Sequence, residues 1–192
     1  MGSQDADGAA ARRVLWTALA LNAAMFVIDV GVGVIARSSG LLADGIDMLG
    51  DAAAYGLSLM ATSRSPTFQR RTAFASGLLL AVSGVVVMAD AIRRAREGGL
   101  PEPHLMAACA LVSLMVNAIV LRMLARFRHG EVHLRASWIF TRADVIANVG
   151  VIVAALLVIV TASRAPDLVV GLSIGAYVIK EAWEILRDAA SA

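Results

Sequence analysis

Three aspartates recur at helical spacing within one apolar stretch of the sequence. Asp44, Asp47 and Asp51 are three, four and seven residues apart, which places their side chains on one face of an α-helix. Neighbouring anions repel one another in a low-dielectric setting, so they stay ionised only when a cation joins them and otherwise take up protons. The spacing therefore predicts cation binding or proton exchange, and a stripe that merely lines a water-filled crevice is the simpler alternative.

A second apolar stretch holds a matching pair of oxygen ligands. Asp144 and Asn148 are four residues apart and share a helix face, and carboxylate and carboxamide oxygens both bind hard or borderline cations. For Asn148 an interhelical hydrogen bond is the alternative. Asn22 and Asp29 also share a face, and counting along antiparallel helices brings Asp29 to the depth of Asp47. The predicted metal ligands are Asp47, Asp51, Asp144 and Asn148, with Asp29 and Asp44 as further candidates.

The composition indicates that lipid surrounds these side chains. Of the 192 residues, 59% are hydrophobic and 17% charged, whereas soluble domains have about 45–50% apolar and about 25% charged residues. A membrane-spanning helix needs about 20 mostly apolar residues. Six stretches qualify, at residues 14–36, 41–62, 72–92, 104–125, 136–161 and 167–186. The sequence thus predicts an all-α membrane protein, a bundle of six transmembrane helices over residues 14–186, with cytoplasmic tails at 1–13 and 187–192.

The arginines predict the orientation of this bundle. More of them lie on the side of the two termini than on the other side, so both termini are expected in the cytoplasm and the chain in the cell (inner) membrane. Three arginines after the third stretch, Arg93, Arg94 and Arg96, oppose this assignment. The net charge of +2 does not indicate nucleic-acid binding, because the basic residues flank apolar stretches.

Two packing features can also be predicted. Asp90 lies beside Arg93 and Arg94, so an interfacial salt bridge explains its charge better than a functional role. Glycines at Gly77 and Gly84 in the third stretch, and in a Gly-x-x-x-Gly motif at 171–175 in the sixth, allow close approach of two helices. We expect the third and sixth helices to pack together, although glycine is also simply common in membrane helices.

Residues 41–52 together with 144–150 resemble the cation diffusion facilitator, or cation efflux, family, and the similarity covers nearly the whole chain. The resemblance implies six membrane helices and a metal site made by a His/Asp-x-x-x-Asp pair and a His-x-x-x-Asp pair. On this chain the first pair falls on Asp47 and Asp51, and the aspartate of the second falls on Asp144. The histidine falls on Phe140, which binds no metal. An oxygen site remains, with Asn148, Asp29 or water as the fourth ligand; manganese and iron(II) then gain weight over zinc, which suits imidazole.

The same resemblance implies efflux of a divalent metal cation in exchange for protons, by alternating access. The cation is a substrate rather than a cofactor, and zinc, manganese, iron, cobalt and cadmium are not distinguished. A homodimer is implied as well. Many members carry a cytoplasmic domain after the sixth helix, and the sequence here stops at Ala192, so we expect a short member or one from which the domain was removed.

Two other functional classes stay open. One is a metal-binding membrane sensor or assembly subunit without transport. The other is an intramembrane aspartyl protease using Asp51 and Asp144, although the sequence has no zinc-protease, serine-hydrolase or phosphate-loop motif and we expect no enzyme. Finally, His129 and His133 lie in the basic segment between the fourth and fifth stretches, where the family resemblance implies a histidine-rich loop. Two histidines are a weak version of such a loop, and we expect both to be solvated.

Overall fold

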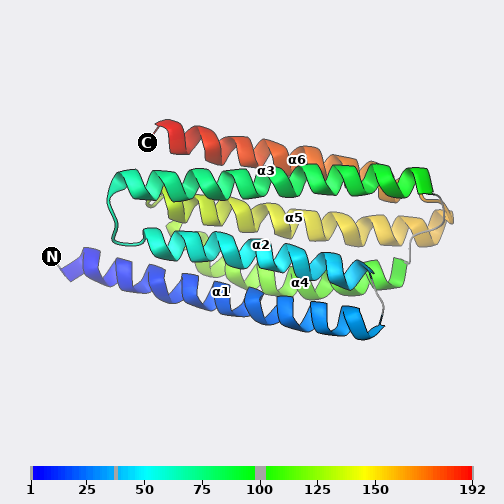
Figure 1. Ribbon diagram of the computed structural model, residues 1–192, viewed down its shortest axis with the longest axis horizontal. Helices are drawn as coiled ribbons and strands as arrows, with labels where there is room; N and C mark the ends of the chain where they lie inside the picture. Colours follow the sequence, from blue (N-terminus) through cyan, green and yellow to red (C-terminus); the bar gives the residue numbers. More distant parts are fainter. Residues whose placement is uncertain (1, 37–38, 98–102, 192) are drawn as a thin grey trace.

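Six α-helices and one short 3-10 turn make up the part of the chain that the computed structural model describes, residues 2–36, 39–97 and 103–191. All six helices lie roughly along one axis (Figure 1). The helices α1, α3 and α5 run away from the end that holds both termini, and α2, α4 and α6 run back to it (Figure 1). We call these the terminal end and the opposite end. The elements are α1 (Gly2–Ala36), α2 (Ser39–Ala61), α3 (Pro66–Glu97), α4 (Pro103–Leu124), η1 (Ala125–Phe127), α5 (Val132–Thr161) and α6 (Ala165–Ser191).

Local signals set several helix ends. Pro66 opens α3 at the first helical position, where its missing N–H costs nothing, and the Ser65 hydroxyl accepts a hydrogen bond from the backbone N–H of Phe68 at 3.4 Å. After α2 and α5, Ser63 and Ala162 have positive φ angles of 66° and 47°, which ends each helix. The helices run past the predicted spans, since α1 begins at Gly2 and α6 reaches Ser191. The predicted tails are therefore largely helical, and their cytoplasmic placement stays a prediction.

Helix length and composition make the chain an integral membrane protein. Four of the described helices, α1, α3, α4 and α5, are long and apolar enough to cross a bilayer. Charged residues interrupt α2 at its aspartates and α6 at Lys180, Glu181 and Glu184. Composition alone therefore does not identify these two helices as membrane spans. The all-helical prediction is confirmed for the described residues, and the count of six spans stays a prediction.

Helices α3 and α6 pack closely along their length (Figure 1). A Cβ atom placed on Gly175 would lie 3.0 Å from the Gly84 carbonyl oxygen and 3.3 Å from the Met88 backbone nitrogen. On Gly171, a Cβ atom would lie 3.1 Å from the Cβ of Ala91. Only glycine allows backbones to approach this closely, and the predicted packing of the third and sixth helices is confirmed.

Two apolar clusters lie on either side of the middle of the bundle. One joins α3, α5 and α6 and takes in Ala54 of α2. The other joins α1, α2, α4 and η1 and takes in Leu134 of α5. Helices α2 and α5 contribute to both clusters, so the seam between them is where the two halves of the core meet.

Candidate metal site

Two buried carboxyl groups face one another across the seam between α2 and α5. The side chain of Asp51 on α2 is fully buried, and that of Asp144 on α5 is 7% exposed. The two carboxyl groups are close enough to interact directly. Both oxygens of Asp51 and Oδ2 of Asp144 lack a hydrogen-bond partner among the described residues. None of the ion pairs formed by those residues includes either aspartate.

Asp47 and Asn148 flank this carboxylate pair. Asp47 lies one turn before Asp51, and its charge acts on both members of the pair, but its side chain is exposed. Asn148 lies one turn after Asp144 and is half-buried. Within residues 2–36, 39–97 and 103–191, no three His, Cys, Asp or Glu side chains are placed to hold one ion together. Asp47 would complete a set of three carboxylates only by turning inward.

A hydroxyl network closes the terminal side of the pair. The hydroxyl of Tyr55, one turn after Asp51, lies 2.8 Å from the Thr141 hydroxyl, which itself donates to the Ser137 carbonyl oxygen at 2.8 Å. A threonine hydroxyl has one proton, so Tyr55 is the donor in its bond to Thr141. The hydroxyl proton of Tyr55 is therefore used in the bond to Thr141, and Tyr55 does not donate to the carboxylates. The charge of the pair is left for a cation or a proton to balance.

Asp29 and Asp44 lie apart from this pair, toward the opposite end and between α1, α2 and α4. The carboxylate of Asp44 accepts a hydrogen bond from the Ser113 hydroxyl of α4, whose oxygen lies 2.9 Å from Oδ1 and 2.8 Å from Oδ2. Asp29 is 5% exposed, and its Oδ2 has no partner in the described part of the chain. The six predicted candidates therefore divide into a central group and this second group.

Comparison with known proteins places the fold in a family. Residues 15–192 match the cation efflux transmembrane domain. The chain belongs to the cation efflux family. It is 30% identical over 194 residues to the zinc transporter ZitB of Escherichia coli, covering 93% of this chain and 61% of that protein. The metal cation efflux system protein CzcD of Cupriavidus metallidurans is 26% identical over 188 residues, covering 92% and 60%. The chain thus spans about three fifths of the length of these relatives.

The family assignment confirms the resemblance recognised from the sequence. Phe140 is 2% exposed and packs in the cluster of α3, α5 and α6, and its match to the second-pair histidine of the family stays a prediction. Sequence reasoning missed Ser113, Tyr55 and Thr141. A signal for them existed, since hydroxyl side chains in apolar helices must bond to something nearby.

The salt bridge predicted for Asp90 is confirmed, and the prediction for His133 was wrong. Asp90 pairs with Arg93 at 2.6 Å and with Arg94 at 2.9 Å. His129 is exposed as expected. His133, in contrast, is 1% exposed in the first turn of α5, because α2 packs over it; Ser58 donates to its carbonyl oxygen at 3.2 Å. Neither of its ring nitrogens has a hydrogen bond among the described residues.

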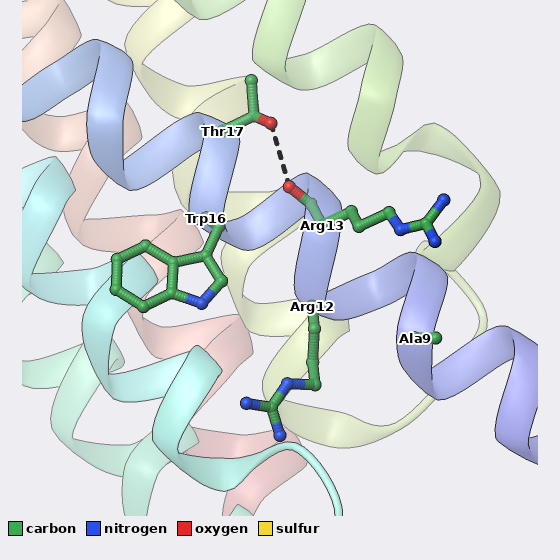
Figure 2. A pocket seen from close by; sticks show the side chains of 5 residues that line it. All are labelled: Ala9, Arg12, Arg13, Trp16 and Thr17. Atoms are coloured by element: carbon green, nitrogen blue, oxygen red, sulfur yellow. Dashed lines mark hydrogen bonds between the residues drawn. The ribbon is translucent and has the colours of Figure 1, made fainter.

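A shallow depression on α1 marks the terminal end of this cation efflux protein. Figure 2 shows Arg12, Arg13 and Trp16 around it, with the Thr17 hydroxyl donating to the Arg13 carbonyl oxygen at 2.9 Å. Trp16 is 54% exposed. The depression has no acidic lining residue, so it is not a cation site. An exposed tryptophan beside arginines is typical of the membrane–water interface.

Proposed function

We propose that this protein carries a divalent metal cation across the membrane and that Asp51 and Asp144 bind it. The observation that carries the proposal is the buried pair of carboxylates, which has neither a basic partner nor a hydrogen-bond donor among the described residues. One ionised aspartate at the centre of a membrane helix costs roughly 2.5–3.5 kcal/mol. A doubly charged ion balances both carboxylate charges at once, which offsets the cost of burying the pair. Relatives that bear the names zinc transporter and metal cation efflux system protein support the same function.

Asp47 and Asn148 complete the ligand set in this proposal. Each lies one helical turn from a member of the pair, and all four side chains offer oxygen ligands. Oxygen ligands suit manganese and iron(II) better than zinc, and in this proposal Phe140 stands where the family resemblance implies an imidazole ligand. We therefore expect Phe140→His to raise the affinity for Zn²⁺ relative to Mn²⁺, and Phe140→Leu to leave that ratio unchanged. Equal ratios in the two variants would show that the missing imidazole does not set selectivity.

Transport in this proposal proceeds by alternating access and metal–proton exchange. Carboxylates bind metal only when deprotonated, so protons arriving from the far side compete with the ion and release it. The seam between α2 and α5 separates the two apolar clusters, and relative movement along it opens the pair to one side and then to the other. All six helices cross the inner membrane in this arrangement. Arg12, Arg13 and Trp16 at the terminal end favour cytoplasmic termini. Transport from the terminal end to the opposite end is then efflux from the cell. We further propose that the protein acts as a homodimer.

Flux into proteoliposomes tests the proposal. The wild-type protein should transport Mn²⁺, Fe²⁺, Co²⁺, Zn²⁺ or Cd²⁺ faster when the opposite compartment is acidic. Asp51→Asn and Asp144→Asn should abolish flux, and the matched variant Asp90→Asn should retain it, because Asp90 belongs to a salt bridge. Full flux in both seam variants would refute the assignment. Metal binding without flux in the wild-type protein would instead identify a sensor or assembly subunit.

A further inference from the structure

We propose a second cation-binding site, formed by Asp29, Asp44 and Ser113 between α1, α2 and α4 and separate from the Asp51–Asp144 pair. The site rests on the proposed function for the identity of its ion, the transported divalent cation. It lies between the central pair and the opposite end of the bundle. An ion that leaves the pair toward that end would meet it next.

Close packing of α1 on α2 brings the two carboxylates together. A Cβ atom on Gly45 would lie 3.4 Å from the Cβ of Asp29 and 3.3 Å from the backbone nitrogen of Val30, so glycine at this position permits the approach. Asp44 is the neighbour of Gly45, and it lies close enough to Asp29 for the charge of Asp29 to act on it. The Ser113 hydroxyl of α4 lies within hydrogen-bonding distance of both oxygens of Asp44. Three helices therefore contribute oxygen atoms to one place.

The negative charge at this place has no counterpart in the described part of the chain. None of the ion pairs found there includes Asp29 or Asp44, and Asp29 Oδ2 is buried without a partner. Ser113 supplies one proton to Asp44 and none to Asp29. Two adjacent carboxylates in low dielectric require a cation or protons, and carboxylate and hydroxyl oxygens suit a hard divalent ion.

Two buried amides extend the oxygen-rich region toward the central pair. Asn117 lies one turn after Ser113 on the same face of α4; it is fully buried, and neither polar atom of its amide has a hydrogen-bond partner within the described ranges. Asn22 lies two turns before Asp29 on the same face of α1, is also fully buried, and has no described residue hydrogen-bonded to its Oδ1. Unpartnered buried amides are costly. Their oxygens make stepwise passage of an ion between two sites of moderate affinity possible, as conduction requires.

Cys109 provides a natural reporter for this site. It is the one cysteine in the sequence, lies one turn before Ser113 on α4, and is half-buried. The charges of both Asp44 and Asp29 act on its thiol. A cation bound between those carboxylates cancels their negative charge and favours the reactive thiolate, so it should speed alkylation of Cys109.

The experiment measures the rate at which N-ethylmaleimide alkylates Cys109 in the purified full chain, with and without Mn²⁺. Mn²⁺ is the probe because it prefers oxygen ligands and binds thiolate weakly. We expect saturating Mn²⁺ to speed alkylation at least about threefold in the wild-type protein. The same acceleration should persist in Asp51→Asn/Asp144→Asn, which lacks the central pair and does not transport. It should disappear in Asp29→Asn/Asp44→Asn, whose thiol should already react faster without metal.

A milder variant keeps the test decisive if the double variant does not fold. Ser113→Ala removes only the hydroxyl that orients Asp44, so half-maximal acceleration should need about 10- to 100-fold more Mn²⁺. Ser173→Ala, at an exposed serine of α6, is the matched control and should behave as the wild type. The proposal is overturned if the acceleration is lost with the central pair, if Ser113→Ala and Ser173→Ala behave alike, or if Mn²⁺ leaves the alkylation rate of the wild-type protein unchanged. Failure of the central site appears separately, as flux that survives in Asp51→Asn/Asp144→Asn.

Discussion

Replacing Asp51 by asparagine should make the metal-free protein more stable while removing its response to metal. The substitution keeps the shape of the side chain and removes one of two facing charges. Two unit charges about 4 Å apart repel by about 4 kcal/mol at an effective dielectric constant of about 20. A proton shared within the pair relieves part of this repulsion, so we expect a gain of roughly 2 kcal/mol, half of the full value. For a chain of this size, 1 kcal/mol moves the melting temperature by about 2–4 °C, which gives a rise of about 4–8 °C.

Metal should stabilise the wild-type protein and leave Asp51→Asn unchanged. At a metal concentration of about 100 times Kd, binding stabilises the wild-type fold by about 2.7 kcal/mol, or about 5–11 °C on the same scale. Asp51→Asn should lose this shift. The assay is thermal unfolding in detergent, followed by tryptophan fluorescence, with Mn²⁺ and Zn²⁺ titrated separately.

Asp90→Asn is the matched control for this experiment. It makes the same chemical change in a partly exposed ion pair, where the expected cost is about 0–1 kcal/mol, and it should keep the full metal-induced shift. If metal-free Asp51→Asn melts below the wild-type protein and still responds to metal, the two carboxylates are not an uncompensated pair and the reasoning fails.

Three further substitutions test the surrounding packing, each by its effect on thermal unfolding in detergent. Gly175→Leu should destabilise the fold by about 1–3 kcal/mol, because its side chain meets backbone atoms of α3; Gly50→Ala, where a Cβ atom meets nothing within 4 Å, should be harmless, and equal effects would contradict the packing. Tyr55→Phe should cost about 0.5–1.5 kcal/mol by removing one buried hydrogen bond, and an unchanged melting temperature would show that the bond contributes nothing. Glu181→Ala should cost about 1–3 kcal/mol, because Arg142 loses its buried partner but is 30% exposed and keeps Glu184 at 3.8 Å; a loss below about 0.5 kcal/mol would mean that solvent already screens this pair.

The pairing of α3 with α6 and the convergence of Asp51 with Asp144 were both predictable from the sequence. Buried charge and close glycine contacts are expensive to misplace in lipid, so few arrangements satisfy them. The salt bridge of Asp90 followed for the same reason, since two arginines lie within one turn of it. The helical spacing of Asp44, Asp47 and Asp51 predicted less accurately which of these side chains are buried. Four residues advance a helix by about 400°, so Asp47 sits about 40° round from Asp51, enough for one side chain to be buried and the other exposed.

Interactions between distant helices could not be predicted in the same way. His133 lies among charged residues in the sequence, yet α2 covers it, and sequence periodicity does not show which helix lies over a given turn. The bond between Asp44 and Ser113 depends on the depth at which α4 packs against α2, which a short polar side chain in an apolar helix does not reveal. The ends of the helices were missed because apolar stretches mark the part of a helix in lipid, and α1 continues beyond it.

The position of Arg142 on α5 ties the central pair mechanically to the last helix. Arg142 is two residues before Asp144, so the two side chains project about 200° apart around the same helix. On its own side Arg142 stacks on Trp138, with 4.7 Å to the ring centre, and pairs with Glu181 of α6. A turn of α5 that reorients Asp144 must therefore either drag α6 with it or break a buried ion pair. Occupancy of the Asp51–Asp144 pair by an ion and the position of α6 are therefore coupled through α5.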